Sequence, residues 1–455
     1  MTAKQLPDRP VEVEKVGIEH IPDGERHGSP GRIFTLWFAA NLTIADYAIG
    51  VLTTVLFGFT VSQAIPILLV GNLLGGLFLG LAAAMGPSLG FPQMFSSRAS
   101  FGRRGNYLPG GLNWISTLGW FAVNTILASE AVRVLLPSVD FAVAATVLVV
   151  VQVVIAVFGH DFIHLFEKVM SIVLGILFLW IFVLTIPHLN EAFSYVPSGS
   201  TGSLGLGMLG TLVAVSFSYL MAWSPYASDY SRYLPASSSR KRVFVFALAG
   251  GAVSSFAIEV LGALIGSLTK SLDYFGALNS FAGSSGPIAI ITVVLGAIAA
   301  NGLNLYTNAL SALVLDVKAR RWLMVAAGGA VGLGISEVGF LAGFEPFFEN
   351  FLLTLDYWIT PWLGIILVDY YLTRRMTTET ASNSPAVSKR TLAIYLLSIL
   401  VSVPFMTDFL RLGPPIGSLL GLSGGADVSY FLSFAVASVL TFALPRKAPT
   451  SSLGR

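Results

Sequence analysis

The chain contains 455 residues, of which 55% are hydrophobic and only 11% are charged, and its mean hydropathy is +0.77. A soluble domain of this length would carry roughly a quarter charged residues. The deficit of charge indicates an exterior that faces lipid, and the net charge of +2 is too small to indicate nucleic-acid binding. The lack of cysteine excludes disulfides, iron–sulfur clusters and thiolate zinc sites.

The first thirty residues are polar and rich in proline, so we expect no cleavable signal peptide there. After them come apolar stretches near 20 residues long, which are typical of transmembrane helices. About twelve spans are predicted: 34–59, 64–85, 108–135, 141–158, 162–186, 204–226, 243–268, 287–314, 322–341, 347–372, 392–406 and 428–444. We therefore expect an N-terminal tail over 1–33, a single transmembrane domain over 34–445 and a C-terminal tail over 446–455.

Lysine and arginine are distributed unevenly between the loops that join these spans. One set of alternate loops holds fifteen: Arg98, Arg103, Arg104, Lys168, Arg232, Arg240, Lys241, Arg242, Lys318, Arg320, Arg321, Arg374, Arg375, Lys389 and Arg390. The opposite set holds three: Arg133, Lys270 and Arg411. Because positive charge accumulates on the cytoplasmic side, we expect a multi-pass protein of the cytoplasmic membrane with both termini in the cytoplasm.

Two of the predicted spans are interrupted. The first contains Asn41, Asp46 and Gly50, and the sixth contains Pro225, which cannot donate to the helix ladder. Irregular backbone within a membrane is tolerated where it is buried in protein or lines a cavity. The two breaks lie five spans apart, which is the spacing of an inverted five-plus-five repeat whose broken helices form the substrate site.

Two groups of polar residues within spans are candidates for binding a ligand. Trp120 and Asn124 are four residues apart and share a helix face, so an indole and an amide could together hold a flat heterocycle. Asn301, Asn304 and Asn308 form a polar stripe on the eighth span. The alternative is structural: an interfacial tryptophan, with amides that only join helices.

Three acids within the predicted spans are considered for a role: Asp46, Glu130 and Glu259. Asp46 and Glu259 are candidates for carrying a proton, because an ionisable group at membrane depth is costly unless it has a function or a partner. For Asp46, an ion pair with a neighbouring helix is the alternative. Glu130 lies near Arg133 and a span end, so we interpret it as half of an interfacial pair.

Motifs of catalysis are absent from the sequence. The five histidines lie in tails or at span ends, and no HExxH or P-loop pattern occurs. We therefore predict no catalytic residue, no cofactor and no metal site. A membrane enzyme would need catalytic groups clustered at depth, and a channel would need a filter motif.

Four segments together resemble the nucleobase–cation symporter-1 family: GIEHIPDGERHGSP over 17–30, SRASFGRRG over 97–105, YASDYSRYLP over 226–235 and the asparagine-rich eighth span. The resemblance implies an all-α LeuT-like fold of five plus five helices with two additional C-terminal helices. It also implies that a planar ring stacks on Trp120 and pairs with Asn124. Asn301 and Asn304 would contact the edge of the ring.

The resemblance further implies contacts from the two broken helices. The sixth span would contribute within 218–223, where we name Tyr219 and Trp223, and the first span would contribute near Thr43. Sodium-coupled relatives carry hydroxyl residues on the eighth span, at positions that we align with Ile298 and Ala299. Sodium prefers oxygen ligands, which these two side chains lack, so protons are the expected coupling ion.

These inferences predict a symporter that imports a nucleobase such as cytosine or a purine together with a cation, expected to be a proton. The alternative on the same fold is a permease for a hydantoin, allantoin, uracil or a vitamin precursor, which could be coupled to sodium. The alternative from another class is the membrane enzyme.

Overall fold

The computed structural model describes residues 12–197, 206–406 and 427–444, and all regular structure in them is helical. The predicted C-terminal tail and Arg411 lie outside the described residues. The principal helices are α1 (Gly31–Ala40), α2 (Ile44–Val55), α3 (Val61–Ala83), α7 (Tyr107–Leu135), α8 (Phe141–Phe158), α9 (His160–Thr185), α11 (Leu206–Met221), α12 (Ala227–Ser231), α13 (Arg240–Thr269), α15 (Gly286–Val314), α16 (Arg321–Ala342), α17 (Phe344–Leu367), α19 (Lys389–Ser402) and α20 (Ser429–Ala443). Shorter helices lie between them: α4 (Gly86–Leu89), α5 (Gln93–Ser96), α6 (Arg98–Phe101), α10 (Leu189–Ser194), α14 (Tyr274–Ala282) and α18 (Thr378–Ser382).

The helices match the predicted spans in order and position. Among the described residues, seven helical segments are long and apolar enough to cross a membrane, and α1 with α2 makes an eighth as a bent pair. The helix α20 is a shorter apolar helix. The prediction of an all-α membrane protein is confirmed.

Both predicted breaks are present. The axes of α1 and α2 differ by 57°, and Thr43 between them caps α2 by accepting a hydrogen bond from the Asp46 amide at 3.3 Å. The second break separates α11 from α12 and holds a 3₁₀ turn, Ser224–Tyr226, around Pro225. Proline fits the first turn of a helix but not its interior, so α11 ends before it and α12 starts after it.

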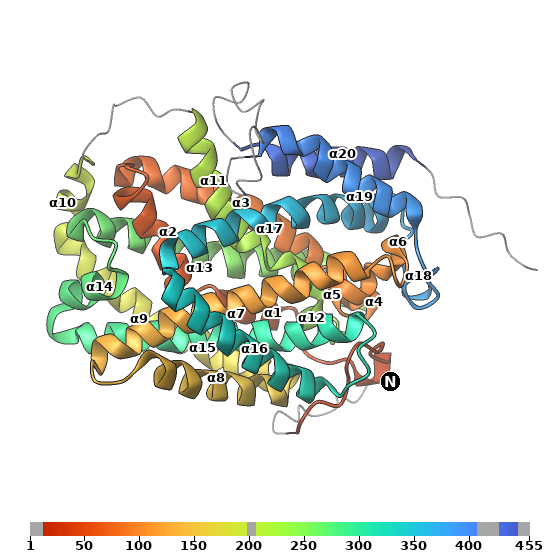
Figure 1. Cartoon of the computed structure of the whole chain (residues 1–455), viewed down its shortest axis with the longest axis horizontal. Helices are drawn as coiled ribbons and strands as arrows, with labels where there is room; N and C mark the ends of the chain where they lie inside the picture. The colour runs from red at the N-terminus through yellow and green to blue at the C-terminus, as the bar shows by residue number, and fades with distance from the viewer. Residues whose placement is uncertain (1–11, 198–205, 407–426, 445–455) are drawn as a thin grey trace, which may run out of the picture.

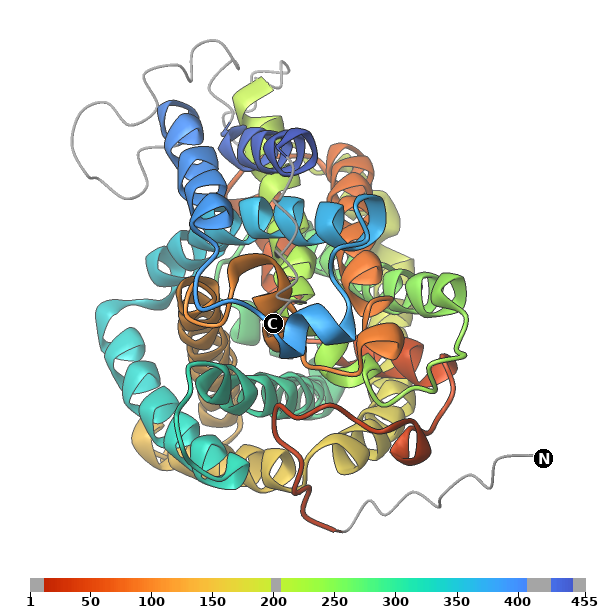
Figure 2. The same ribbon diagram turned by 90° about the vertical axis from the view of Figure 1, so that its right-hand side faces the viewer.

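The long helices lie side by side, and α4, α5, α6 and α18 gather at one end of the bundle (Figures 1 and 2). Basic loops meet at this end. The Arg103 amide bonds the Pro385 oxygen at 2.8 Å, Arg98 and Arg103 both pair with Asp316, and Arg240 stacks on Tyr370. The loops predicted to carry positive charge therefore lie on the same side. That this side is cytoplasmic remains a prediction.

Glycines let α2 lie directly against α13. A β-carbon on Gly50 would lie 1.8 Å from the backbone oxygen of Glu259, and one on Gly262 would lie 2.1 Å from that of Tyr47. Neither helix could approach so closely with a larger residue at these positions, as is common where membrane helices pack through small residues. This contact places Asp46 of α2 next to Glu259 of α13.

Candidate substrate site

Three aromatic rings from three helices meet at Trp120 of α7. The Trp120 ring makes edge-on contacts with Tyr219 of α11 and Phe351 of α17, at centroid distances of 5.3 and 5.2 Å. The Tyr219 hydroxyl bonds Thr43 Oγ1 at 2.8 Å, at the break between α1 and α2. The structure thus brings together three of the predicted residues, Trp120, Tyr219 and Thr43. An aromatic wall of this kind suits a flat ring.

A chain of amides lies one turn along α7 from this wall. The Asn301 amide nitrogen of α15 donates to the Phe121 backbone oxygen at 3.0 Å, to Thr125 Oγ1 at 3.1 Å and to Gln152 Oε1 at 3.2 Å. Because a backbone oxygen only accepts, the Asn301 side chain has one possible orientation. Its Oδ1 then faces Asn124 and Asn304, whose amide nitrogens donate to it at 3.2 and 3.1 Å.

The same row of hydrogen-bonded amides also fixes the orientation of Asn124. The Asn124 nitrogen donates to Asn301, while Asn124 Oδ1 is buried and has no hydrogen-bond partner among the described residues. A buried acceptor without a partner costs roughly 1–3 kcal/mol, so a ligand that donates a hydrogen bond would stabilise it. Asn124 lies on the same face of α7 as Trp120. The two side chains therefore suit a flat ring with an N–H on its edge.

Asn301 and Asn304 form hydrogen bonds with other side chains of the protein. Both hydrogens of the Asn301 amide are used within the protein, so its role in the structure is to orient Asn124 and Asn304. Asn304 Oδ1 accepts from the Tyr226 hydroxyl at 3.3 Å. The sequence analysis missed Tyr226 and Gln152. The signals were available, because Tyr226 follows the helix-breaking Pro225 and Gln152 is a lone amide in a valine-rich span.

Trp223 and Asn308 do not join the aromatic wall. The Trp223 indole nitrogen donates to Asn41 Oδ1 at 2.9 Å, and its ring packs on Trp37 and Tyr226. It therefore links the two helix breaks. Asn308 donates to the Trp114 oxygen and to Thr117 Oγ1, both at 2.9 Å, and holds α15 to α7.

The two candidate proton carriers lie together. The Asp46 carboxyl is fully buried beside Ser255 and Glu259 of α13. Glu259 Oε2 accepts from Ser216 Oγ at 2.9 Å and from the Asn72 amide. Glu130 instead pairs with Arg133 at 2.7 Å, and both side chains are about one-third exposed, as predicted.

Gly296 of α15 lies against the break between α1 and α2. A β-carbon on Gly296 would lie 2.2 Å from the Leu42 backbone oxygen, so α15 approaches the break closely at this position.

Comparison with known proteins identifies the family. The family of permeases for cytosine/purines, uracil, thiamine and allantoin matches residues 20–433. The YxlA protein of Bacillus subtilis, provisionally assigned by name as a purine-cytosine permease, is 34% identical over 95% of this chain and 96% of its own length. The purine-cytosine permease FCY2 of Saccharomyces cerevisiae is 27% identical over 80% of this chain and 72% of its own. This chain belongs to that permease family.

A solved structure of the same family shows the fold. The nucleobase-cation-symport-1 transporter Mhp1, in a closed conformation with bromovinylhydantoin bound, superposes with a TM-score of 0.78 at 20% identity, covering 95% of each chain. The LeuT-like five-plus-five fold with two additional helices is therefore confirmed. The relatives are named as permeases and transporters, so the permease is not an enzyme.

Replacing Trp120 by alanine should weaken substrate binding while the protein remains folded in the membrane. Stacking on an aromatic side chain contributes ~1–3 kcal/mol per base, so the apparent affinity should fall between about 5-fold and 150-fold. Competition binding of a labelled base to purified protein measures this. Trp322→Ala on α16, where the indole is 42% exposed, is the matched control. Unchanged affinity in Trp120→Ala would exclude the stacking role.

Among the asparagines of α15, Asn301→Ala and Asn304→Ala should each lower substrate affinity roughly tenfold, because partners left unpaired in a buried site cost ~1–3 kcal/mol. Asn308→Ala should affect affinity less, since its contacts join α15 to α7 away from Trp120. Affinity and melting temperature are measured on each variant. If Asn308→Ala were the most damaging to affinity, the substrate would have to lie one turn further along α15.

Proposed function

We propose that this permease is a secondary active transporter that imports a nucleobase such as cytosine or a purine. One observation carries the proposal: the buried Asn124 Oδ1 is fixed as an acceptor and lies on the same helix face as Trp120. Cytosine and the purines are flat rings with N–H groups on their edges, so they match an aromatic wall beside an acceptor. The names of the relatives in Bacillus and yeast support the same class.

A second candidate is a related ring on the same fold. A yeast relative, 22% identical, is named a vitamin B6 transporter, and the Mhp1 structure holds a hydantoin. Stacking on Trp120 would serve these rings as well. The groups on the edge of the ring distinguish these compounds from nucleobases. Where a carbonyl replaces an amine on that edge, one of several hydrogen bonds to the protein changes.

Uptake of radiolabelled cytosine or hypoxanthine by cells that express the permease tests the proposal. Unlabelled cytosine, adenine, guanine and hypoxanthine should compete, whereas pyridoxine, allantoin and a hydantoin should compete weakly. A ring methylated at the N–H that faces Asn124 should lose affinity, because the acceptor would then be buried without a donor. Competition by pyridoxine or a hydantoin, with none by the bases, would establish the second candidate.

The transport cycle is proposed to be coupled to protons. Two carboxyls, Asp46 and Glu259, lie side by side in the membrane interior, and hydroxyl and amide groups are their neighbours. Two adjacent negative charges in a medium of low dielectric repel strongly, so the pair is expected to hold at least one proton. Ile298 and Ala299, which align with hydroxyl residues of sodium-coupled relatives, supply no side-chain oxygen to a sodium ion.

In proteoliposomes, an inward proton gradient should drive uptake, and an inward sodium gradient should have no effect. Asp46→Asn and Glu259→Gln should each leave binding of the base within a few-fold and abolish accumulation against a gradient, because an amide holds no exchangeable proton of this kind. Glu130→Gln, which changes an exposed acid, is the control. Sodium-driven uptake would overturn proton coupling, and proton-driven accumulation in both variants would move the carrier elsewhere.

We also propose on which side of the membrane the two termini of the chain lie. Both termini are placed in the cytoplasm, because the basic loops share one end of the bundle and positive loops are retained on the cytoplasmic side.

A further inference from the structure

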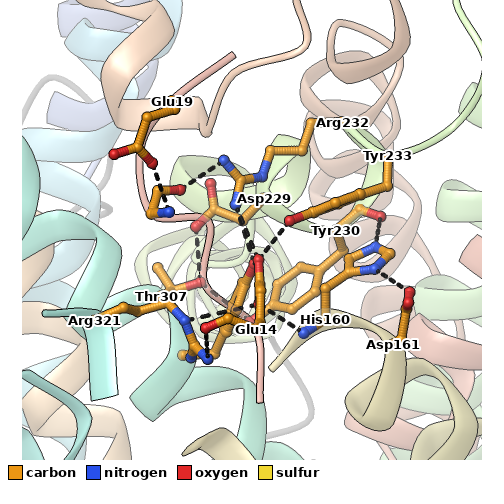
Figure 3. A network of polar contacts seen from close by, with 12 residues as sticks. Glu14, Glu19, His160, Asp161, Asp229, Tyr230, Arg232, Tyr233, Thr307 and Arg321 are labelled. Atoms are coloured by element: carbon orange, nitrogen blue, oxygen red, sulfur yellow. Dashed lines mark hydrogen bonds and ion pairs between the residues drawn. The ribbon is translucent and has the colours of Figure 1, made fainter. Parts of the chain in front are cut away.

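The segment before α1 crosses the end of the helix bundle, where it is held by a network of polar contacts (Figure 3). Glu14 is the centre of this network. Its carboxyl accepts hydrogen bonds from the Tyr233 hydroxyl at 2.5 Å, the Tyr306 hydroxyl at 3.0 Å and the His160 amide at 2.9 Å. The segment is therefore fixed against α9, α15 and the loop after α12, and this placement brings His27 to the start of α9.

At the start of α9, two histidines converge on one carboxylate. His27 Nε2 lies 2.7 Å and His160 Nδ1 lies 2.9 Å from Asp161 Oδ1. One ligand atom from each of the three residues lies within 4.8 Å of the others. Two imidazole nitrogens and a carboxylate oxygen so close together form the donor set of a transition-metal site.

In each ring the outer nitrogen, the one that faces away from Asp161, already has a hydrogen-bond partner. His27 Nδ1 lies 2.9 Å from the Glu25 backbone oxygen, and His160 Nε2 lies 3.3 Å from that of Tyr230. A backbone oxygen only accepts, so each outer nitrogen carries the hydrogen. Each inner nitrogen thus faces Asp161, and once it carries no proton its lone pair is available to a metal ion. Histidine ligands of metals are held in the same way, with the second nitrogen donating to a carbonyl or carboxylate.

We propose that His27, His160 and Asp161 bind a divalent transition-metal ion such as Zn²⁺, with water completing a tetrahedral shell. Mixed nitrogen and oxygen ligands favour Zn²⁺, Ni²⁺ or Cu²⁺ over Mg²⁺ and Ca²⁺, which prefer oxygen alone. The ion would join the segment before α1 to the start of α9. The contacts of the two rings with Asp161 would thereby be replaced by three coordinate bonds, of which the one from His27 comes from a segment far away in sequence.

The surroundings allow an ion to enter and also limit its affinity. The three side chains are 13%, 5% and 26% exposed for His27, His160 and Asp161. A cavity of about 360 Å³ opens beside Asp161 and is lined by Arg32 and Lys168, among others. These two positive charges repel a cation. We therefore expect weaker binding than at a site built from thiolates.

Metal binding to the full-length permease, purified without a polyhistidine tag and stripped with a chelator, tests this proposal. Zn²⁺ is titrated in competition with a chromophoric chelator, and Co²⁺ is used as a spectroscopic probe of the coordination geometry. One equivalent of Zn²⁺ should bind, and Co²⁺ should give the visible absorption of a nitrogen-ligated tetrahedral site. His27→Gln and Asp161→Asn should each weaken binding at least about tenfold, because each removes one of three ligands.

His188→Gln is the matched control, because His188 is half exposed and lies at the far end of α9, next to Glu191. This variant should bind Zn²⁺ like the wild type. The melting temperature of each purified, metal-free variant reports whether it is folded. Absence of saturable Zn²⁺ binding to the wild type, or equal binding in His27→Gln and His188→Gln, would overturn the proposal. The result does not depend on which substrate is transported.

Discussion

The candidate site depends on one hydrogen bond, from the Asn301 amide to the backbone oxygen of Phe121. That oxygen cannot donate, so it fixes Asn301, and Asn301 in turn fixes the amides of Asn124 and Asn304. The orientation of a whole row of amides, and hence the presence of a free acceptor beside Trp120, follows from a main-chain group of α7. In a membrane no water competes for these groups, so a satisfied chain holds its geometry.

The same lack of water explains why the breaks and the glycines occur together. An unwound segment leaves backbone and side-chain groups that need partners, and Asn41 and Thr43 find theirs on α11 and in the turn after it. Close approach of the neighbouring helices encloses these groups. Gly296 brings α15 against Leu42, and Gly50 with Gly262 brings α13 against α2. The protein thus surrounds its irregular backbone with helices that pack through small residues.

The sequence predicted the helices and breaks well because each has a local cause: a long apolar run for a helix, polar residues such as Asn41 at the first break, and Pro225 at the second. It also placed Trp120 beside Asn124, since a four-residue spacing defines one face. Spacing alone could not rank Asn301, Asn304 and Asn308, because α15 is buried on nearly all sides and periodicity there identifies no single face. The family resemblance is what singled out Asn301 and Asn304.

Groups formed by distant segments were beyond sequence reasoning. His160 directly precedes Asp161, but His27 is separated from Asp161 by 134 positions, so the sequence does not show that the three residues meet. Tyr226 and Gln152 each carried a local signal, but the helices that they contact could not be predicted from it. By contrast, Asp46 and Glu259 were named singly as acids at depth, and only the glycine contact between α2 and α13 makes them a pair.

That pairing bears on how a substrate site and an ion site could influence each other. Coupling requires an element that both sites contact and that has two arrangements. The start of α2 meets the first condition. Thr43 bonds Tyr219 of the aromatic wall at 2.8 Å and the Asp46 amide at 3.3 Å. A ring that reorients Tyr219 therefore acts on the cap of the helix that carries Asp46. Thr43 and Tyr219 therefore connect the proposed proton carrier Asp46 with Trp120, the residue proposed to stack on the substrate.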